Sequence, residues 1–262
     1  MTAPVGVFDS GVGGLSVARE IRRALPAEHL LYVADTAYLP YGDRGDDEVR
    51  ARTLAIGEWI QSRRAKVLVV ACNTASGAAL EALRETLAIP VIGLEPALKP
   101  AVRQTRNGRV GVMATVGTLR SARFQRLVDN YADGVQVVRD PCPGLADLVE
   151  DGLFAGPDLA ARMKEYVAPL RESGVDTVVL GCTHYVFVRD AIREALGPEV
   201  RLLDSGEAIA RRTRQILTEA GALETEGGVG TVRILTTGDP AEVAPVIHRL
   251  WGDAADVERL EI

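Results

Sequence analysis

The chain has 262 residues, of which 47% are hydrophobic and 25% charged, and its net charge is −6. This composition is ordinary for a soluble globular protein, and the length suits one large α/β domain or two smaller ones. The acidic balance argues against a nucleic-acid-binding face, which would be basic. No apolar run reaches the ~18 residues that would span a bilayer. The first predicted strand begins too early to leave room for a signal peptide. A cytoplasmic protein without membrane or nucleic-acid partners is therefore expected.

Apolar runs of strand length alternate with helix-periodic stretches along most of the chain, which predicts parallel βαβ units. The predicted strands cover residues 5–8, 30–34, 67–71, 91–93, 110–113, 135–139, 177–181, 200–203 and 231–236. The predicted helices cover residues 14–24, 46–63, 76–86, 157–173, 188–196, 207–220 and 240–251, with a loop at 221–230.

An internal repeat of about 110 residues relates the two halves of this pattern. Val5-Gly6-Val7-Phe8 resembles Val110-Gly111-Val112-Met113, and Cys72 and Cys182 each follow a predicted buried strand. The repeat predicts an α/β fold of two pseudo-symmetric lobes, each a mainly parallel sheet flanked by helices, with an active site in the cleft between them. Lobe A is expected to comprise residues 1–96 plus 208–262, and lobe B residues 97–207, since the last segment is too short for a third domain.

The two matching cysteines are the first candidates for chemistry. Each is followed by two polar residues, Asn73 and Thr74 in one copy and Thr183 and His184 in the other. Ligands of open α/β sheets bind at the carboxyl ends of strands, where a helix N-terminus stabilises a thiolate. His184 could hold or relay a proton for Cys182. One such cysteine alone would more often be a small core residue, but two in matching contexts favour a catalytic pair. Cys142 has no counterpart and is interpreted as structural.

Three further motifs are weaker indications of a functional site. The glycine-rich turn that follows Asp9 and Ser10 is not a P-loop and fits a dinucleotide fingerprint poorly. Asp9 suits an ammonium group or the orientation of a thiol, and Ser10 a carboxylate, although the glycines could serve only a tight turn. Tyr41 and Gly42 could form a pocket wall, and Glu150, near a helix end, is by default a solvated carboxylate.

The scarcity of lysine and histidine limits which cofactors the protein could hold. There are only three lysines and three histidines, and neither set has the context of a pyridoxal Schiff base or the spacing of a metal site. Chemistry without a cofactor is predicted. Two thiols on opposite sides of one ligand can remove a proton from one face of a carbon and return one to the other, which is racemisation.

Five motifs, in this order, resemble glutamate racemases of the cofactor-independent aspartate/glutamate racemase superfamily over roughly residues 5 to 215. They are Phe8-Asp9-Ser10-Gly11-Val12-Gly13-Gly14-Leu15, Pro40-Tyr41-Gly42, Ala71-Cys72-Asn73-Thr74-Ala75-Ser76, Val149-Glu150-Asp151-Gly152 and Leu180-Gly181-Cys182-Thr183-His184-Tyr185. The resemblance implies interconversion of L- and D-glutamate, supplying D-glutamate for peptidoglycan, by an enzyme that is often a homodimer.

The resemblance also implies roles for residues. Cys72 and Cys182 would be the acid/base pair, supported by Asp9, His184 and Glu150. Substrate contacts would come from Asp9, Ser10, Tyr41, Gly42, Asn73, Thr74, Thr183 and His184. Some members have an N-terminal extension used by a cell-wall precursor activator; because Asp9 lies so near the start, no such control is expected here.

Three alternatives remain open from the sequence. The same machinery could act on aspartate, since the sequence does not reveal how far the pocket reaches. Two hinged α/β lobes also describe amino-acid-binding receptors, which are usually exported and need no paired thiols. Some racemases of this kind also act on DNA gyrase, which the acidic balance neither supports nor excludes.

Overall fold

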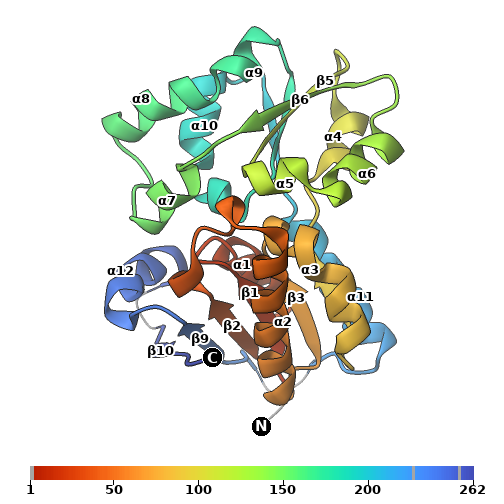
Figure 1. Ribbon diagram of the computed structural model, residues 1–262, viewed down its shortest axis with the longest axis vertical. Helices are drawn as coiled ribbons and strands as arrows, with labels where there is room; N and C mark the ends of the chain where they lie inside the picture. Colours follow the sequence, from red (N-terminus) through yellow and green to blue (C-terminus); the bar gives the residue numbers. More distant parts are fainter. Residues whose placement is uncertain (1–2, 226–227, 253–254) are drawn as a thin grey trace.

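The computed structural model describes residues 3–225, 228–252 and 255–262, which form two parallel β-sheets in two lobes (Figure 1). The larger sheet has the strand order β10-β9-β2-β1-β3-β4 and the smaller one β6-β5-β7-β8. Their bounds are β1 Val5–Asp9, β2 Leu30–Ala34, β3 Val67–Val70, β4 Val91–Gly93, β5 Arg109–Ala114, β6 Gln136–Pro141, β7 Thr177–Leu180, β8 Arg201–Leu203, β9 Val232–Thr236 and β10 Val257–Arg259.

The two sheets repeat one arrangement, as the internal repeat predicts. In lobe A, β1 lies between β2 and β3, with β4 beyond β3; in lobe B, β5 lies between β6 and β7, with β8 beyond β7. All of these pairs are parallel, with Val5 opposite Val67 and Val110 opposite Thr177. The strands that precede Cys72 and Cys182, β3 and β7, thus hold equivalent places. The predicted fold class, two pseudo-symmetric parallel-sheet lobes, is confirmed.

Alternating side chains of the strands pack on helices at both faces of each sheet. In lobe A, Val5 and Val7 face one core cluster and Phe8 faces another. The first cluster lies under α1 (Leu15–Ala24) and α11 (Gly206–Glu219), and the second under α2 (Asp46–Ser62) and α3 (Asn73–Thr86). Lobe B is covered by α4 (Leu98–Gln104) and α6 (Ala122–Tyr131) on one face and by α8 (Pro157–Tyr166), α9 (Ala168–Glu172) and α10 (Arg189–Leu196) on the other.

The chain crosses between the sheets twice, once between β4 and α4 and once between β8 and α11. The last helix, α12 (Pro240–Trp251), packs with β10 in lobe A (Figure 1). The predicted boundary at 96/97 falls in the first crossing, whereas the one at 207/208 lies two residues inside α11, and both boundaries remain our proposal. No helix in the described part of the chain is both long and apolar enough to cross a membrane.

Several predicted elements were wrong in extent, and some were missed. The helix predicted at 157–173 is two helices, α8 and α9, because Pro169 lacks the N–H that a continuous helix needs. α3 begins three residues before the predicted position. β10 and the helices α4, α5 (Val116–Arg120), α6 and α7 (Leu145–Glu150) were not predicted. Most of these are too short to show a clear period. Residues 226–227 of the predicted loop lie outside the described residues.

Candidate active site

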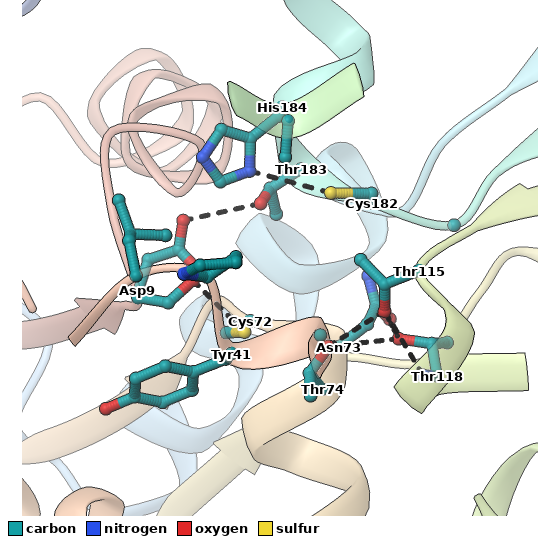
Figure 2. A pocket seen from close by; sticks show the side chains of 16 residues that line it. Asp9, Tyr41, Cys72, Asn73, Thr74, Thr115, Thr118, Cys182, Thr183 and His184 are labelled. Carbon is teal, nitrogen blue, oxygen red and sulfur yellow. Dashed lines mark hydrogen bonds between the residues drawn. The ribbon is translucent and has the colours of Figure 1, made fainter. Parts of the chain in front are cut away.

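A small cavity lies between the lobes, lined by residues at or just after the carboxyl ends of β1, β3, β5 and β7. Figure 2 shows the side chains that line it. All the site residues predicted from the sequence line it, except Glu150: Asp9, Ser10, Tyr41, Gly42, Cys72, Asn73, Thr74, Cys182, Thr183 and His184. Cys72 and Cys182 are only 6% and 8% exposed, so both thiols face a nearly closed space. Cys72 comes from lobe A and Cys182 from lobe B.

Cys72 is the N-cap of α3. Its Sγ accepts a hydrogen bond from the Ala75 amide at 3.4 Å and donates to Ser10 Oγ at 3.7 Å. Burial raises the pKa of the Cys72 thiol, and the negative charge of Asp9 raises it further, against the smaller opposing effect of those two hydrogen bonds. The helix N-terminus therefore does not make a resting thiolate here, because the cost of burying the charge is larger. The raised pKa keeps Cys72 in the thiol form.

Asp9 ends β1 and is completely buried beside Cys72. Its Oδ2 accepts hydrogen bonds from the Gly14 amide and from Thr183 Oγ1 of the other lobe, the latter at 3.4 Å. Burial raises the pKa of Asp9 to about 6, although His184 and the Gly14 amide pull it down. Asp9 Oδ1 and Asn73 Oδ1 are buried acceptors that have no partner among the described residues. Such acceptors suit an ammonium group, which has three donors and no acceptor.

On the lobe B side, Cys182, His184 and Glu150 form a chain of hydrogen bonds. Cys182 Sγ lies 3.5 Å from His184 Nδ1, and His184 Nε2 lies 2.6 Å from Glu150 Oε1. Burial by itself would lower the pKa of His184, but the charges of Cys182 and Glu150 and the hydrogen bonds to both raise it well above 6.5. A protonated imidazole beside the sulfur stabilises a thiolate. The surroundings of Cys182 therefore differ from those of Cys72, which has a buried carboxylate and no histidine beside it.

The default interpretation of Glu150 as a solvated carboxylate was wrong. Its side chain is 16% exposed, contacts His184 and does not line the cavity. Glu150 Oε1 also accepts the amide of Val12, in the glycine-rich turn of lobe A, at 2.8 Å. The turn approaches Glu150 and His184 so closely that only glycine fits at two of its positions. A Cβ on Gly11 would lie 2.0 Å from Glu150 Oε1, and one on Gly13 would lie 2.3 Å from His184 Nδ1.

The structure adds two residues that the sequence interpretation missed. Thr115, which follows β5, and Thr118 in α5 line the cavity, and their hydroxyls lie 3.0 Å apart. Thr74 Oγ1, from lobe A, lies 3.0 and 3.3 Å from the same two hydroxyls (Figure 2). Three converging hydroxyls suit a carboxylate. The internal repeat could have found Thr115, because it occupies in lobe B the place that Ser10 has in lobe A.

Tyr41 differs from the expectation in its orientation. It lines the cavity and is 2% exposed, but its hydroxyl donates to Asp35 Oδ2 at 2.6 Å and points away from the two cysteines (Figure 2). Asp35 also accepts from Arg52 and from Thr237 Oγ1. Tyr41 therefore presents its ring and backbone to the cavity and not its hydroxyl.

Two parallel-sheet lobes with a cysteine from each at the cavity between them indicate a class of enzyme, the cofactor-independent amino-acid racemases. The family model for Asp/Glu/hydantoin racemases matches residues 5–213, and the chain belongs to this family. Among curated relatives, the glutamate racemase of Pseudomonas aeruginosa is 48% identical over all of this chain and 98% of its own length. That of Stutzerimonas stutzeri is 48% identical over 98% of this chain and 97% of its own.

Solved structures give the same result. Glutamate racemase isoform RacE1 of Bacillus anthracis superposes with a TM-score of 0.91 at 36% identity, covering 99% of this chain and 98% of its own. The Escherichia coli glutamate racemase, in complex with L-glutamate and the activator UDP-MurNAc-ala, has a TM-score of 0.87 at 37% identity, covering 98% of both chains.

Proposed function

We propose that this protein is a glutamate racemase that interconverts L- and D-glutamate without a cofactor, with Cys72 and Cys182 as its two acid/base residues. The observation that carries the proposal is that the two thiols, one from each lobe, line one cavity and have different partners. Cys72 lies beside the buried Asp9, and Cys182 beside the His184–Glu150 pair. A thiol and a thiolate on opposite sides of Cα are what stereochemical inversion requires.

In the proposed step, the Cys182 thiolate removes the α-proton from one face of the substrate, and the Cys72 thiol gives its proton to the other face. The reverse direction exchanges the two roles. The unpartnered oxygens of Asp9 and Asn73 would receive the α-ammonium, and the threonine hydroxyls a carboxylate. Because the cavity is nearly closed, these fixed dipoles act in little water, which strengthens their stabilisation of the charge that develops at Cα.

The relatives support glutamate as the substrate, since two of them are solved with L- or D-glutamate bound. Aspartate is the alternative, since it offers the same α-carbon with a side chain one methylene shorter. The purified protein, with no added cofactor, should convert L-glutamate to D-glutamate as followed by chiral chromatography, and should convert L-aspartate much more slowly. A faster reaction with aspartate would overturn the substrate assignment, and ligand binding without turnover would favour a receptor.

Single serine variants test the pair of thiols. Cys72→Ser and Cys182→Ser should each lower kcat for racemisation by at least about 100-fold, since a positioned acid/base group contributes on that scale. Cys142→Ser is the matched control: Cys142 is equally buried but does not line the cavity, and its variant should keep its activity. A kcat for racemisation close to that of the wild type in either active-site variant would contradict the two-base scheme.

We further propose that the enzyme is cytoplasmic, supplies D-glutamate for peptidoglycan and forms a homodimer. Only the last can be tested on the purified protein. Light scattering after size-exclusion chromatography should give a mass twice the 28.0 kDa of one chain. A mass of 28.0 kDa at all concentrations would contradict the homodimer.

A further inference from the structure

The C-terminal helix α12 lies beyond residues 5–213, the part that the family model matches, yet it reaches the segment that carries Glu150. Arg249, an exposed residue near the end of α12, donates from Nη1 to the carbonyl of Gly152 at 2.6 Å. Its guanidinium also lies 4.4 Å from the ring centroid of Phe154. Arg249 belongs to lobe A, whereas Gly152 and Phe154 belong to lobe B, so both contacts cross between the lobes.

The bond to Gly152 holds the C-terminus of α7, the helix that ends with Glu150. Gly152 donates to the carbonyl of Val149 at 3.0 Å, and Leu153 to that of Leu148 at 2.8 Å, which together make a Schellman motif. Gly152 has a φ of +77°, the left-handed conformation that this motif needs. Arg249 thus satisfies the carbonyl that follows the helix end and fixes the turn two residues after Glu150.

The contact between Arg249 and the Phe154 ring connects Arg249 to the segment that carries His184. Phe154 packs against Phe187, with ring centroids 6.4 Å apart and planes tilted by 52°. Phe187 lies in the short helix η3 (Thr183–Val188), three residues after His184. Arg249 therefore contacts the segment of Glu150 directly and that of His184 through one aromatic pair. It contacts neither Cys72 nor its partners Asp9 and Ser10.

We infer that Arg249 is a positioning residue for the acid/base reaction, which holds the Glu150–His184 pair in place for Cys182. The inference rests on the proposed function, because it takes Cys182 as one of the two bases. Arg249 acts through Glu150 and His184 and does not touch the substrate. Its loss should therefore slow proton transfer by Cys182 and leave proton transfer by Cys72 unchanged.

Single-cysteine backgrounds separate the two transfers. In D2O, the Cys72→Ser variant can exchange the α-proton only through Cys182, and the Cys182→Ser variant only through Cys72, each with one enantiomer of glutamate. Adding Arg249→Gln to Cys72→Ser should lower its exchange rate, measured by proton NMR, about 10-fold, since small displacements of positioned groups cost rates of this order. Adding it to Cys182→Ser should change nothing.

Two controls accompany the experiment. Arg249→Lys can still donate to the Gly152 carbonyl and should restore part of the rate in the Cys72→Ser background. Arg233→Gln removes an exposed arginine of the same C-terminal segment, paired with Glu258 at 2.7 Å, and should have no effect. Equal loss of exchange in both single-cysteine backgrounds, or no loss in either, would overturn the inference. Absence of exchange by Cys72→Ser with both enantiomers would instead overturn the proposed two-base function, and the inference with it.

Discussion

At the scale of single residues, the two thiols have the same place in the repeat but different chemical surroundings. Cys72 lies beside a buried carboxylate, and burial together with Asp9 raises its pKa. Cys182 lies 3.5 Å from a histidine whose other nitrogen contacts Glu150. Cys72 is thus kept as a thiol by its surroundings, whereas Cys182 has beside its sulfur the imidazole of His184, whose pKa is raised. In the proposed scheme, the two cysteines exchange the roles of acid and base between one enantiomer of the substrate and the other.

Asp9 gives this scheme a pH dependence. Its pKa is raised to about 6, so the carboxyl keeps its proton to a higher pH than an ordinary aspartate and becomes ionised only as the pH rises through 6. If the carboxylate form receives the substrate ammonium, kcat/KM should fall as the pH drops from 7 to 5. The pH profile of the wild type should show this limb, because kcat/KM reports groups of the free enzyme.

The isosteric variant Asp9→Asn is the control for this assignment. It cannot ionise, so its residual activity should be low and should lack the limb near pH 6. An unchanged limb in Asp9→Asn would assign that titration to another group and contradict the role given to Asp9.

At the scale of elements, the site residues lie on strand–turn–helix units, and the sequence predicted the positions of some of them. The positions of Cys72 and Cys182 at strand ends followed from the apolar runs before them, and the polar residues after each cysteine also line the cavity. The contact between Glu150 and His184 was not predictable from local pattern, because the two residues are 34 positions apart and meet only in the folded lobe. Likewise, the orientation of the Tyr41 hydroxyl depends on Asp35, a partner that lies on a different element.

The glycine-rich turn after β1 leaves no room for a Cβ at Gly11 or Gly13. In Gly13→Ala, the new Cβ would lie 2.3 Å from His184 Nδ1 and 2.6 Å from Thr183 Oγ1, so both side chains must move. Displacements of this size should lower kcat by roughly 100-fold. Gly45→Ala is a matched control, because Gly45 has open space around it and an ordinary negative φ of −70°, and it should retain full activity. Steady-state kinetics of both variants make the test, and normal activity in Gly13→Ala would contradict the close approach.

At the scale of the whole molecule, the internal repeat predicted two equivalent lobes, and the strand orders confirm them. The sequence could not predict how the lobes are joined, since that depends on contacts made only after each has folded. Those contacts involve the site itself: Thr183 of lobe B donates to Asp9 of lobe A, and Val12 of lobe A donates to Glu150 of lobe B. The contacts that join the lobes therefore include groups of the proposed acid/base site.

The central claim is that two different groups remove and return the α-proton. It is tested most directly by incubating wild-type enzyme with L-glutamate in D2O and measuring deuterium at Cα in both enantiomers during the first few per cent of conversion. The account predicts that the D-glutamate formed is fully deuterated, because its proton comes from a thiol equilibrated with solvent, while the remaining L-glutamate keeps its proton. D-glutamate that retains the original proton would show that a single base carries it across, and would contradict the account.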